Sequence, residues 1–323
     1  MLRYLVDLMF KIDRHEVPIA IRALKTANVY EITGRKRIIV DTGMSDESYN
    51  ELMAQGLSME NVDYIFLTHM HIDHIGSAHR MQQEFGIPVA MGEEDIKRVN
   101  AIKESPEDFR DSLLEIMRMN GTPSAITDQM IQRHFVLDHL DTYLRIEFDI
   151  HLRGNEEIIP GVRALFNPGH SPGSFSLYIA ECSCLFSGDH ILPGITPNIS
   201  FYDDSTDMLG LYLESLKHTR TLGAKMVYPG HRSPFENANN RIDQLIAHHN
   251  ERMKEIAGIA SKWMTAYEVA ESMKWSKERN LVSMNLMEMN FAIGEAISHL
   301  MHMEADGMLD RKEENGLYLY RKP

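Results

Sequence analysis

Residues 68–74 of this chain read Thr-His-Met-His-Ile-Asp-His and directly follow a short apolar run. Such a run predicts a buried strand, so three imidazoles and one carboxyl group enter a loop at the end of that strand. Burying these groups without a partner is unfavourable, whereas neutral imidazole and carboxylate together suit Zn²⁺ and similar ions. His69 and His71 can point the same way from an extended backbone and bind one ion, while Asp73 and His74 can serve a second.

Three later fragments repeat the pattern of an apolar strand that ends in a glycine-containing turn and then presents a possible ligand. A Pro-Gly-His turn ends at His170, a Ser-Gly-Asp turn ends at Asp189, and a second Pro-Gly-His turn ends at His231. Glycine before each ligand lets the backbone bend sharply and lets an ion approach closely. Each fragment alone is a weak signal.

Short β-like runs alternate with turn signals through much of the first 230 residues. They predict strands at residues 28–33, 37–43, 62–68, 87–90, 161–166, 174–180, 184–187 and 225–228. Residues 46–53 are predicted to form a helix capped by Ser45. From about residue 94 to 149 the apolar spacing becomes helical, which predicts an inserted helical cap. Strands with interleaved helices favour a layered α/β fold.

The strand pattern ends after Pro234, and the rest of the sequence predicts helices followed by a hairpin. The expected elements are a long helix over 241–261, a helix from a Thr265 cap through Met273, a helix over 284–305, and a hairpin ending at 317–320. This order predicts a small winged-helix-like domain, so we divide the chain into residues 1–240 and residues 241–323. Residues 261–323 hold eight basic and ten acidic side chains. Because DNA recognition needs a basic face, we expect this domain to serve packing or formation of a homodimer.

The charge balance restricts the kinds of partner. The chain has 33 Lys and Arg against 47 Asp and Glu, a net charge of −14. Non-specific binding of nucleic acid depends on basic side chains, so this balance argues against it as the main function. No apolar stretch is long enough to span a membrane, and Arg3 and Asp7 interrupt any signal-like core. We therefore expect a cytoplasmic protein with no membrane partner.

The two cysteines, Cys182 and Cys184, stand two residues apart in a predicted strand. Residues at this spacing point to the same face of a strand but do not close an unstrained bridge. We expect both to pack in the core, and the pair gives no sign of a secreted disulfide scaffold.

Taken together and in this order, the ligand fragments resemble those of the metallo-β-lactamase superfamily, in particular its two-metal hydrolases such as glyoxalase II, RNase Z and quorum-quenching lactonases. The resemblance covers about residues 28–235. It implies a four-layer αββα sandwich for residues 1–240, with the helical insertion at about 94–149. The winged-helix-like tail is similar to that of a subgroup in which endoribonuclease activity is known.

The resemblance also implies a role for each candidate ligand. His69, His71 and His170 would hold the first of two divalent metal ions, and Asp73, His74 and His231 would hold the second, with Asp189 bridging both. Asp41 would orient a ligand histidine by accepting its other ring N–H. We expect zinc, with iron or manganese as alternatives that the same ligands accept.

The implied chemistry is hydrolysis by a hydroxide that bridges the metals, with Asp73 and His74 as catalytic residues. Asp189 stands where true β-lactamases of the family have Cys or Ser, so the resemblance disfavours hydrolysis of β-lactam drugs. His71 stands where the oxygen-reducing diiron members have Glu, so it also disfavours oxygen reduction. A methionine-rich insertion suits an acyl group, so we expect a small-molecule thioester, lactone or related ester as substrate. The alternative is a phosphodiesterase or endoribonuclease acting on single-stranded RNA, and a further one is a binding module with a structural metal site.

Other side chains near the ligands leave two interpretations open. His190 could carry protons or make a structural hydrogen bond, and Ser171, Ser174 and Tyr228 could contact substrate or stabilise their turns. Methionines in the insertion (Met117, Met119 and Met130) could line a substrate pocket or simply pack. Those in the tail (Met284, Met287, Met289, Met301 and Met303) indicate a core or a dimer surface. The remaining histidines are treated as packing or solvated residues: His79, His134, His139, His151, His218, His248, His249, His299 and His302.

Overall fold

Two sheets of six strands form the centre of the structure, a computed structural model that describes residues 10–21, 24–275 and 279–323. The first sheet has the order β1 (Lys11–Pro18), β2 (Thr26–Thr33), β3 (Arg37–Val40), β4 (Tyr64–Phe66), β5 (Val89–Gly92) and β6 (Ile150–Leu152). The second has the order β12 (Phe235–Glu236), β11 (Met226–Pro229), β10 (Cys184–Gly188), β9 (Phe175–Ile179), β8 (Val162–Phe166) and β7 (Glu156–Ile159). Strands β3 to β6 are parallel, as are β10 and β11, and the other pairs are antiparallel.

The two sheets pack face to face because their strands are apolar on both sides. In β4, Phe66 points into the core between the sheets and its neighbour Ile65 points into the core under the helices. In β10, Phe186 and Leu185 divide in the same way between the inner core and the helices of the other side. Strands buried on both faces read as continuous apolar runs, which explains why the sequence signalled them clearly.

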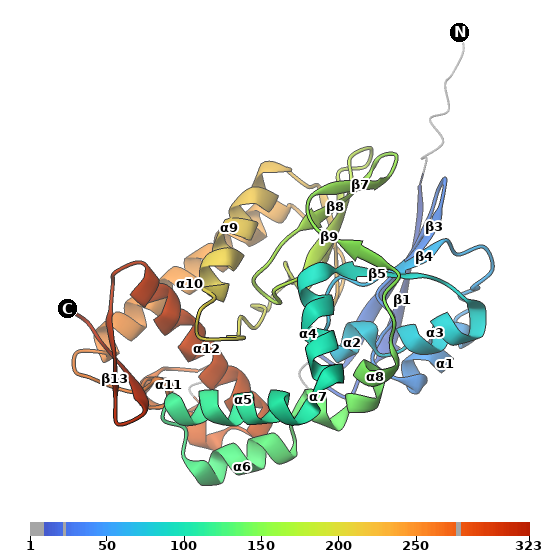
Figure 1. Ribbon diagram of the computed structural model, residues 1–323. Helices are drawn as coiled ribbons and strands as arrows, with labels where there is room; N and C mark the ends of the chain where they lie inside the picture. The colour runs from blue at the N-terminus through green and yellow to red at the C-terminus, as the bar shows by residue number, and fades with distance from the viewer. Residues whose placement is uncertain (1–9, 22–23, 276–278) are drawn as a thin grey trace.

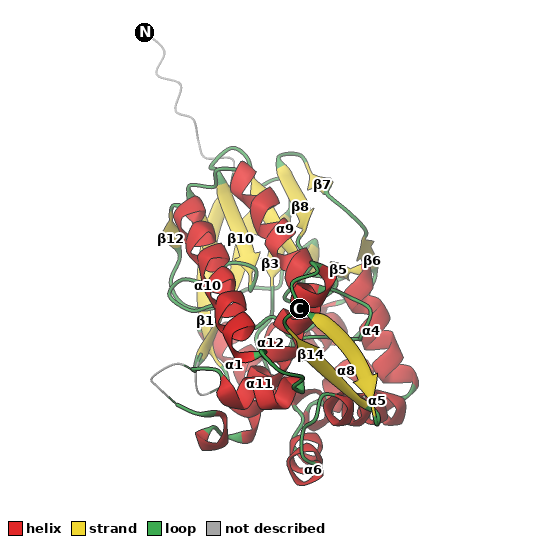
Figure 2. Cartoon of the chain, turned by 90° about the vertical axis from the view of Figure 1, so that its left-hand side faces the viewer, coloured by secondary structure: helices red, strands yellow, loops and turns green. Residues whose placement is uncertain are grey.

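Helices cover the outer face of each sheet, so the body has four layers (Figures 1 and 2). Helices α1 (Asp46–Ala54), α2 (Ile72–Ile75), α3 (Ala78–Phe85), α4 (Glu93–Glu104) and α8 (Leu140–Arg145) bury apolar side chains against the first sheet. Helices α9 (Met208–Thr221) and α10 (Ala238–Ile259) cover the second. The predicted α/β class with two sheets between helices is confirmed.

The predicted helical insertion lies between β5 and β6. It consists of α4, α5 (Pro106–Met119), α6 (Ser124–Gln132), α7 (Phe135–Asp138) and α8. Met117 and Met130 are buried in an apolar cluster with the C-terminal helices. For Met117 and Met130 the structure supports packing, whereas Met119 is only partly buried and lies outside this cluster.

The C-terminal part follows the expected order of helix, helix and hairpin. Its elements are α11 (Ala266–Ser272), the 3-10 helix η2 (Leu281–Ser283), α12 (Leu286–Ala305), β13 (Asp310–Glu314) and β14 (Leu317–Arg321). Thr265 caps α11, and Glu268 completes a reciprocal capping box. Met264 pairs with Tyr320 beside the hairpin. The methionines of α12 mostly belong to the core, since Met289, Met301 and Met303 are buried there.

The sequence pattern did not predict some of the helices and strands. Strands β1, β6 and β7, and helix α9, had not been predicted, and β12 shows that strand pairing continues just past Pro234. Strand β1 is mostly polar and only one of its residues, Val17, is buried. An edge strand of this kind lacks the apolar run on which the strand prediction depended.

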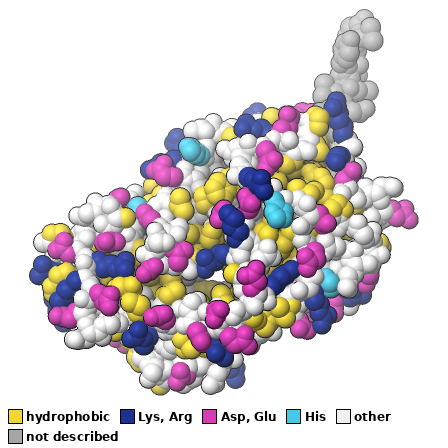
Figure 3. All heavy atoms as spheres, viewed as in Figure 1, with side chains coloured by type: hydrophobic (Ala, Val, Ile, Leu, Met, Phe, Trp, Pro, Cys, Tyr) yellow, Lys and Arg dark blue, Asp and Glu magenta, His cyan; other side chains and the backbone are white. Residues whose placement is uncertain are grey.

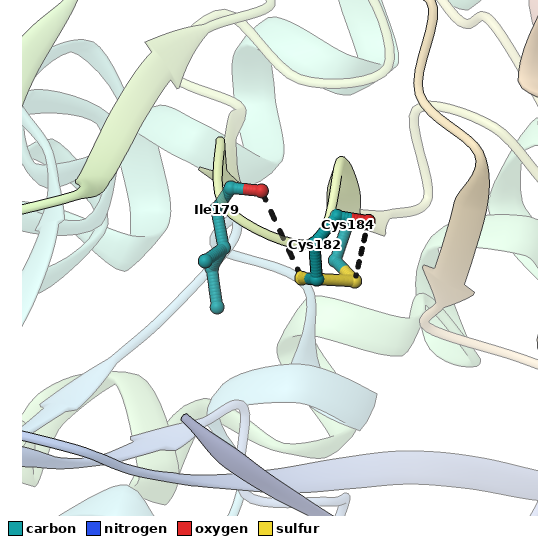
Figure 4. Close-up of a disulfide and its surroundings, with 3 residues drawn as sticks. All are labelled: Ile179, Cys182 and Cys184. Atoms are coloured by element: carbon teal, nitrogen blue, oxygen red, sulfur yellow. Dashed lines mark hydrogen bonds between the residues drawn. A yellow bond between two sulfur atoms is a disulfide. The ribbon is translucent and has the colours of Figure 1, made fainter. Parts of the chain in front are cut away.

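A disulfide joins Cys182 to Cys184 (Figure 4), so the prediction that they stay unbridged is wrong, although both pack at the core between the sheets as predicted. That prediction placed both cysteines in one extended strand, whereas Cys182 lies in the turn between β9 and β10. Ser183 between them has a φ of 52° and turns the chain. The two Cα atoms are therefore 5.2 Å apart, within the range that a disulfide spans.

Among the described residues, every helix is too short or too polar to cross a lipid bilayer. The stretch that contains Arg3 and Asp7 lies outside the described residues.

Candidate metal centre

The seven predicted ligands come together at the ends of four strands from the two sheets. The His-x-His-x-Asp-His stretch leaves β4 of the first sheet and enters α2. His170 follows β8, Asp189 follows β10 and His231 follows β11, all in the second sheet. The site therefore lies where the carboxyl ends of strands from the two sheets meet. Six of its seven side chains are buried.

The side chains form two adjoining groups. Ligand atoms of His69, His71 and His170 lie within 4.8 Å of one another, and so do those of Asp73, His74 and His231. A third trio, His69, His74 and Asp189, connects the two groups. The Asp189 carboxylate is 3.7 Å from His170 Nε2 on one side and 3.4 Å from His231 Nε2 on the other.

The atoms that face the centre lack hydrogen-bond partners. The Nε2 atoms of four of these histidines and one carboxylate oxygen are fully buried and unpaired: His69, His74, His170, His231 and Asp189 Oδ1. Orphaned polar atoms are unfavourable unless something binds them. Their convergence on one point fits a site that holds cations.

In the two histidines of the Pro-Gly-His turns, the ring nitrogen that points away from the centre is hydrogen-bonded. Nδ1 of His170 lies 2.8 Å from the Asn198 carbonyl oxygen, and Nδ1 of His231 lies 2.8 Å from the Thr26 carbonyl oxygen. A carbonyl only accepts, so each Nδ1 carries a proton and each Nε2 is left to face the centre. Histidines that bind metals commonly have this arrangement.

The spacing of the facing atoms also suits a divalent ion. Two ligands bound about 2.0–2.1 Å from an ion in a tetrahedral site lie about 3.4 Å apart. His231 Nε2 is 3.2 Å from the nearer Asp73 oxygen and 3.4 Å from Asp189, and His74 Nε2 is 3.5 Å from Asp189. The residues present thus fit a pair of metal ions in both donor type and separation.

Asp41 contacts His74 of the second group on the side away from the centre, as the family resemblance implied. One of its oxygens lies 2.8 Å from His74 Nδ1, and Thr68 donates to the carboxylate through both its backbone N–H and its hydroxyl. The φ of Asp41 is 60°, which places the Val-Asp-Thr-Gly turn against the ligand loop. His74 is thereby fixed with Nε2 toward the centre.

Burial keeps the three histidines of the first group in the neutral form that metal binding requires. Burial, reinforced by neighbouring imidazoles, holds the pKa of His69 well below its usual value and lowers that of His71 to about 3. Burial lowers the pKa of His170 as well. These imidazoles are neutral at pH 7 and can act as ligands.

In the second group, interactions between carboxylates and imidazoles determine the pKa values. Burial alone would raise the pKa of Asp73, but His74 and His231 lower it to about 2. Burial opposes protonation of His74, yet Asp41, Asp73 and Asp189 together raise its pKa to about 9. A cation in this group would replace the proton as the positive partner of the carboxylates.

Glycines before three ligands explain why the turns recur. Gly169 and Gly188 have φ values of 142° and 49°, which other residues rarely adopt. A Cβ on Gly230 would lie 2.5 Å from Asp189 Oδ1 and 2.7 Å from His74 Cε1. Two glycines therefore permit the turn and the third permits the close approach of ligands.

Sequence reasoning missed several residues that support the ligands. Asp95 of α4 is fully buried and accepts from Met70 N, Ser171 Oγ and Gly173 N, so it ties the loops of His69 and His170 together. Nothing in the polar start of α4 distinguishes Asp95 from its acidic neighbours. Tyr202, whose hydroxyl lies 3.0 Å from His71 Nε2, was also missed.

The weaker candidates turn out to contact protein groups. Ser171 and Ser174 hydrogen-bond each other, and Tyr228 packs on Tyr30 and Phe186. His190 Nε2 lies 3.0 Å from Thr219 Oγ1. These contacts support the structural interpretation of each residue.

Comparison with known proteins identifies the family. The model of the metallo-beta-lactamase superfamily matches residues 23–231, which is more than half of the chain. The chain belongs to this superfamily. A second model, the metallo-beta-lactamase-like C-terminal domain, matches residues 254–323.

Similar structures extend over nearly the whole chain. A beta-lactamase domain protein from Burkholderia ambifaria has a TM-score of 0.81 at 26% identity, covering 97% of this chain and 92% of the other. A metallo-beta-lactamase family protein from Thermus thermophilus has a TM-score of 0.78 at 26% identity, covering 97% of this chain and 98% of the other. The likeness therefore includes the C-terminal part.

Curated relatives are more distant. A beta-lactamase-like protein 2 homolog from Caenorhabditis elegans is 28% identical over 72% of this chain and 65% of its own length. An atrochrysone carboxyl ACP thioesterase from Aspergillus fumigatus is 23% identical over 72% of this chain and 59% of its own length. The chain thus spans less than two thirds of the length of these relatives.

Proposed function

We propose that this protein is a binuclear metal-dependent hydrolase of thioesters, lactones or related carboxylic esters. The observation that carries the proposal is the convergence of buried, unpaired imidazole and carboxylate atoms at ligand spacing. In this proposal His69, His71 and His170 hold the first ion. Asp73, His74 and His231 hold the second, and Asp189 contacts both. Zinc suits this set of nitrogen and oxygen donors.

The residues of the chain have distinct tasks in such a reaction. When bound, two divalent ions would supply hydroxide at neutral pH and polarise the carbonyl oxygen of the substrate. Asp73 is ionised at neutral pH because its pKa is held at about 2. It can accept the proton that the attacking water loses and return it to the expelled group. His74, fixed by Asp41, keeps its Nε2 directed to the same point.

Three features favour an acyl substrate over a polyanion. Figure 3 shows a hollow near the middle of one face, in the region between α4 and α12, with hydrophobic side chains among the charged ones at its rim. The net charge of −14 opposes approach of RNA. A relative is named as a thioesterase, whose substrate is a thioester on an acyl carrier protein by that name.

We extend the proposal to the organisation of the chain. We place the domain boundary near residue 240 and assign the C-terminal part as a winged-helix-like domain. Helix α10 connects the two parts, because Ile242 and Leu245 pack against the second sheet while Met253 and Ile256 pack with α11 and α12. We also propose a cytoplasmic homodimer, for which exposed Phe291 on α12 offers a contact.

The test combines metal analysis with a substrate panel. Protein reconstituted with zinc, manganese or iron should hold two ions per chain and hydrolyse acyl thioesters or lactones. His69→Ala should lower turnover by at least about 100-fold, while the exposed His218→Ala should match the wild type. Cleavage of single-stranded RNA without ester turnover would replace the proposed substrate, and failure to bind ions would overturn the metal centre.

A further inference from the structure

The segment between β10 and α9 touches two histidines of the first metal group. Its residue Asn198 accepts from His170 Nδ1, and the hydroxyl of its residue Tyr202 lies 3.0 Å from His71 Nε2. Tyr202 is 131 positions from His71 in the sequence. One segment, residues 190–207, thus reaches the outer side of two of the three imidazoles.

The hydroxyl of Tyr202 has a defined hydrogen-bond direction. It donates to the carbonyl oxygen of His170 at 3.2 Å, so its own proton is already used. Toward His71 the Tyr202 oxygen can only accept, which places the ring proton of His71 on Nε2. Nδ1 of His71 is then the nitrogen left with a lone pair. This differs from His170, in which Nδ1 carries the proton and Nε2 is free.

The C-terminal part holds this segment from the opposite side. Phe201 is buried in the apolar cluster of α11 and α12. Ser200 lies so close to α12 that a Cβ on Gly294 would be 2.4 Å from its hydroxyl oxygen. Tyr318 of β14 donates to Asp204 at 3.1 Å.

The end of the segment is anchored as well. His302 of α12 lies 2.8 Å from Asp207, the residue that caps α9. From the insertion, Arg98 stacks on the Tyr202 ring at 4.6 Å and donates to the Tyr202 carbonyl oxygen at 2.8 Å. The position of Tyr202 therefore depends on packing from both α4 and the C-terminal part.

We propose that Tyr202 is a positioning residue that sets the tautomer of His71, and that the C-terminal part controls the first metal site by holding residues 198–207 in place. The inference rests on the proposed metal centre. It assigns the C-terminal part a role in metal affinity rather than in binding a macromolecule. Loss of the Tyr202 hydroxyl leaves a partly buried imidazole N–H without its acceptor and frees the proton of His71 to move to the ligand nitrogen.

Tyr202→Phe tests the first half of the proposal. It keeps the ring under Arg98 and removes only the hydroxyl. Tyr49→Phe is the matched control, since buried Tyr49 of α1 loses a contact with Glu84 on the outer side of the first sheet. Metal-free protein is titrated with zinc in competition with a chromophoric chelator, which gives two dissociation constants. We expect Tyr202→Phe to weaken one ion by about 10–100-fold and leave the other within threefold of the wild type, and Tyr49→Phe to change neither.

Cobalt-loaded protein provides a readout that loss of packing alone does not imitate. The paramagnetic ion shifts the ring N–H protons of bound histidines out of the protein NMR envelope. The N–H signal of His71 should disappear by solvent exchange in Tyr202→Phe, while those of His170 and His231 persist. The double variant His302→Leu/Tyr318→Phe should weaken the same ion several-fold with Tyr202 intact.

Three results would decide against the inference. Wild-type affinity for both ions in Tyr202→Phe would show that the hydroxyl does not set the tautomer. Unchanged affinities in the double variant would separate the C-terminal part from the metal site. If the wild type itself binds fewer than two ions, the proposed metal centre fails, and this is seen before any variant is measured.

Discussion

Replacing Asp41 by asparagine should weaken one metal site through the tautomer of a single histidine. Asp41 is 2% exposed and accepts three hydrogen bonds. Oδ1 accepts from Thr68 N at 2.8 Å, whereas Oδ2 lies 2.9 Å from Thr68 Oγ1 and 2.8 Å from His74 Nδ1. Asparagine keeps one oxygen, which must remain opposite Thr68 N because that donor cannot rotate. The amide NH₂ then faces His74 Nδ1.

Two donors cannot face each other, so His74 must respond. Its proton can move to Nε2, which lets Nδ1 accept from the amide but blocks the nitrogen that faces the centre. The hydrogen bond lost or inverted here is one to a charged group, which contributes about 1.5–3 kcal/mol. That range corresponds to a loss of about 10–150-fold in affinity for the second ion. The first ion, whose histidines Asp41 does not touch, should be affected less than tenfold.

The assay is the same zinc competition titration, with Asp95→Asn as the control. Asp95 is equally buried and also accepts three hydrogen bonds, but from two main-chain N–H groups and the Ser171 hydroxyl rather than from an imidazole. We expect Asp95→Asn to lower the free energy of unfolding without weakening the second ion selectively, because Asp95 supports only the loops of His69 and His170. Selective loss of the second ion in both variants, or in neither, would refute the tautomer explanation for Asp41.

Three further predictions concern packing, pH and the leaving group. Gly230→Ala should reduce bound metal below two ions per chain by pushing on Asp189, while Gly154→Ala, with open space around it, should leave the metal content unchanged in elemental analysis. Burial lowers the pKa of His299 to about 4, so the unfolded chain takes up the proton first as pH falls below about 6.5. This one shift should cost about 2 kcal/mol of unfolding free energy between pH 7 and pH 5, so in denaturant titrations of metal-free protein His299→Gln should lose that much less than the wild type over this range, and equal losses would contradict the assignment. Asp73→Asn should slow hydrolysis of oxygen esters more than that of matched thioesters, because a thiolate leaves without needing a proton; a constant ratio between the two substrates would exclude Asp73 as the proton donor.

The sequence was sufficient to predict the layered fold because the central strands are buried on both faces. Runs such as Tyr64–Phe66 and Cys184–Gly188 are apolar at every position or nearly so, and each ends just before a ligand. The glycine turns before His170 and Asp189 marked where the ligands would be presented. Polar edge elements such as β1 carry no such pattern, because half of their surface faces water.

The cysteine pair shows where local reasoning fails. Strand periodicity was extended through residue 182, but the chain turns at Ser183 and brings Cys182 beside Cys184. The limit of a strand depends on where its neighbour stops pairing, and β9 pairs with β10 only from Cys184 onward. Pairing partners are not visible in one stretch of sequence.

By itself, the sequence determined which side chains gather at the strand ends, because ligand identity and the glycine turns are encoded within a few neighbouring residues. The tertiary structure alone decided how those side chains are held. Asp95, Asn198 and Tyr202 contact ligand loops that are far away along the chain, and only packing of α4, the segment after β10 and the C-terminal helices brings them there. The type of ion site is therefore a local property of this chain, whereas the proton positions of its histidines are a property of the whole fold.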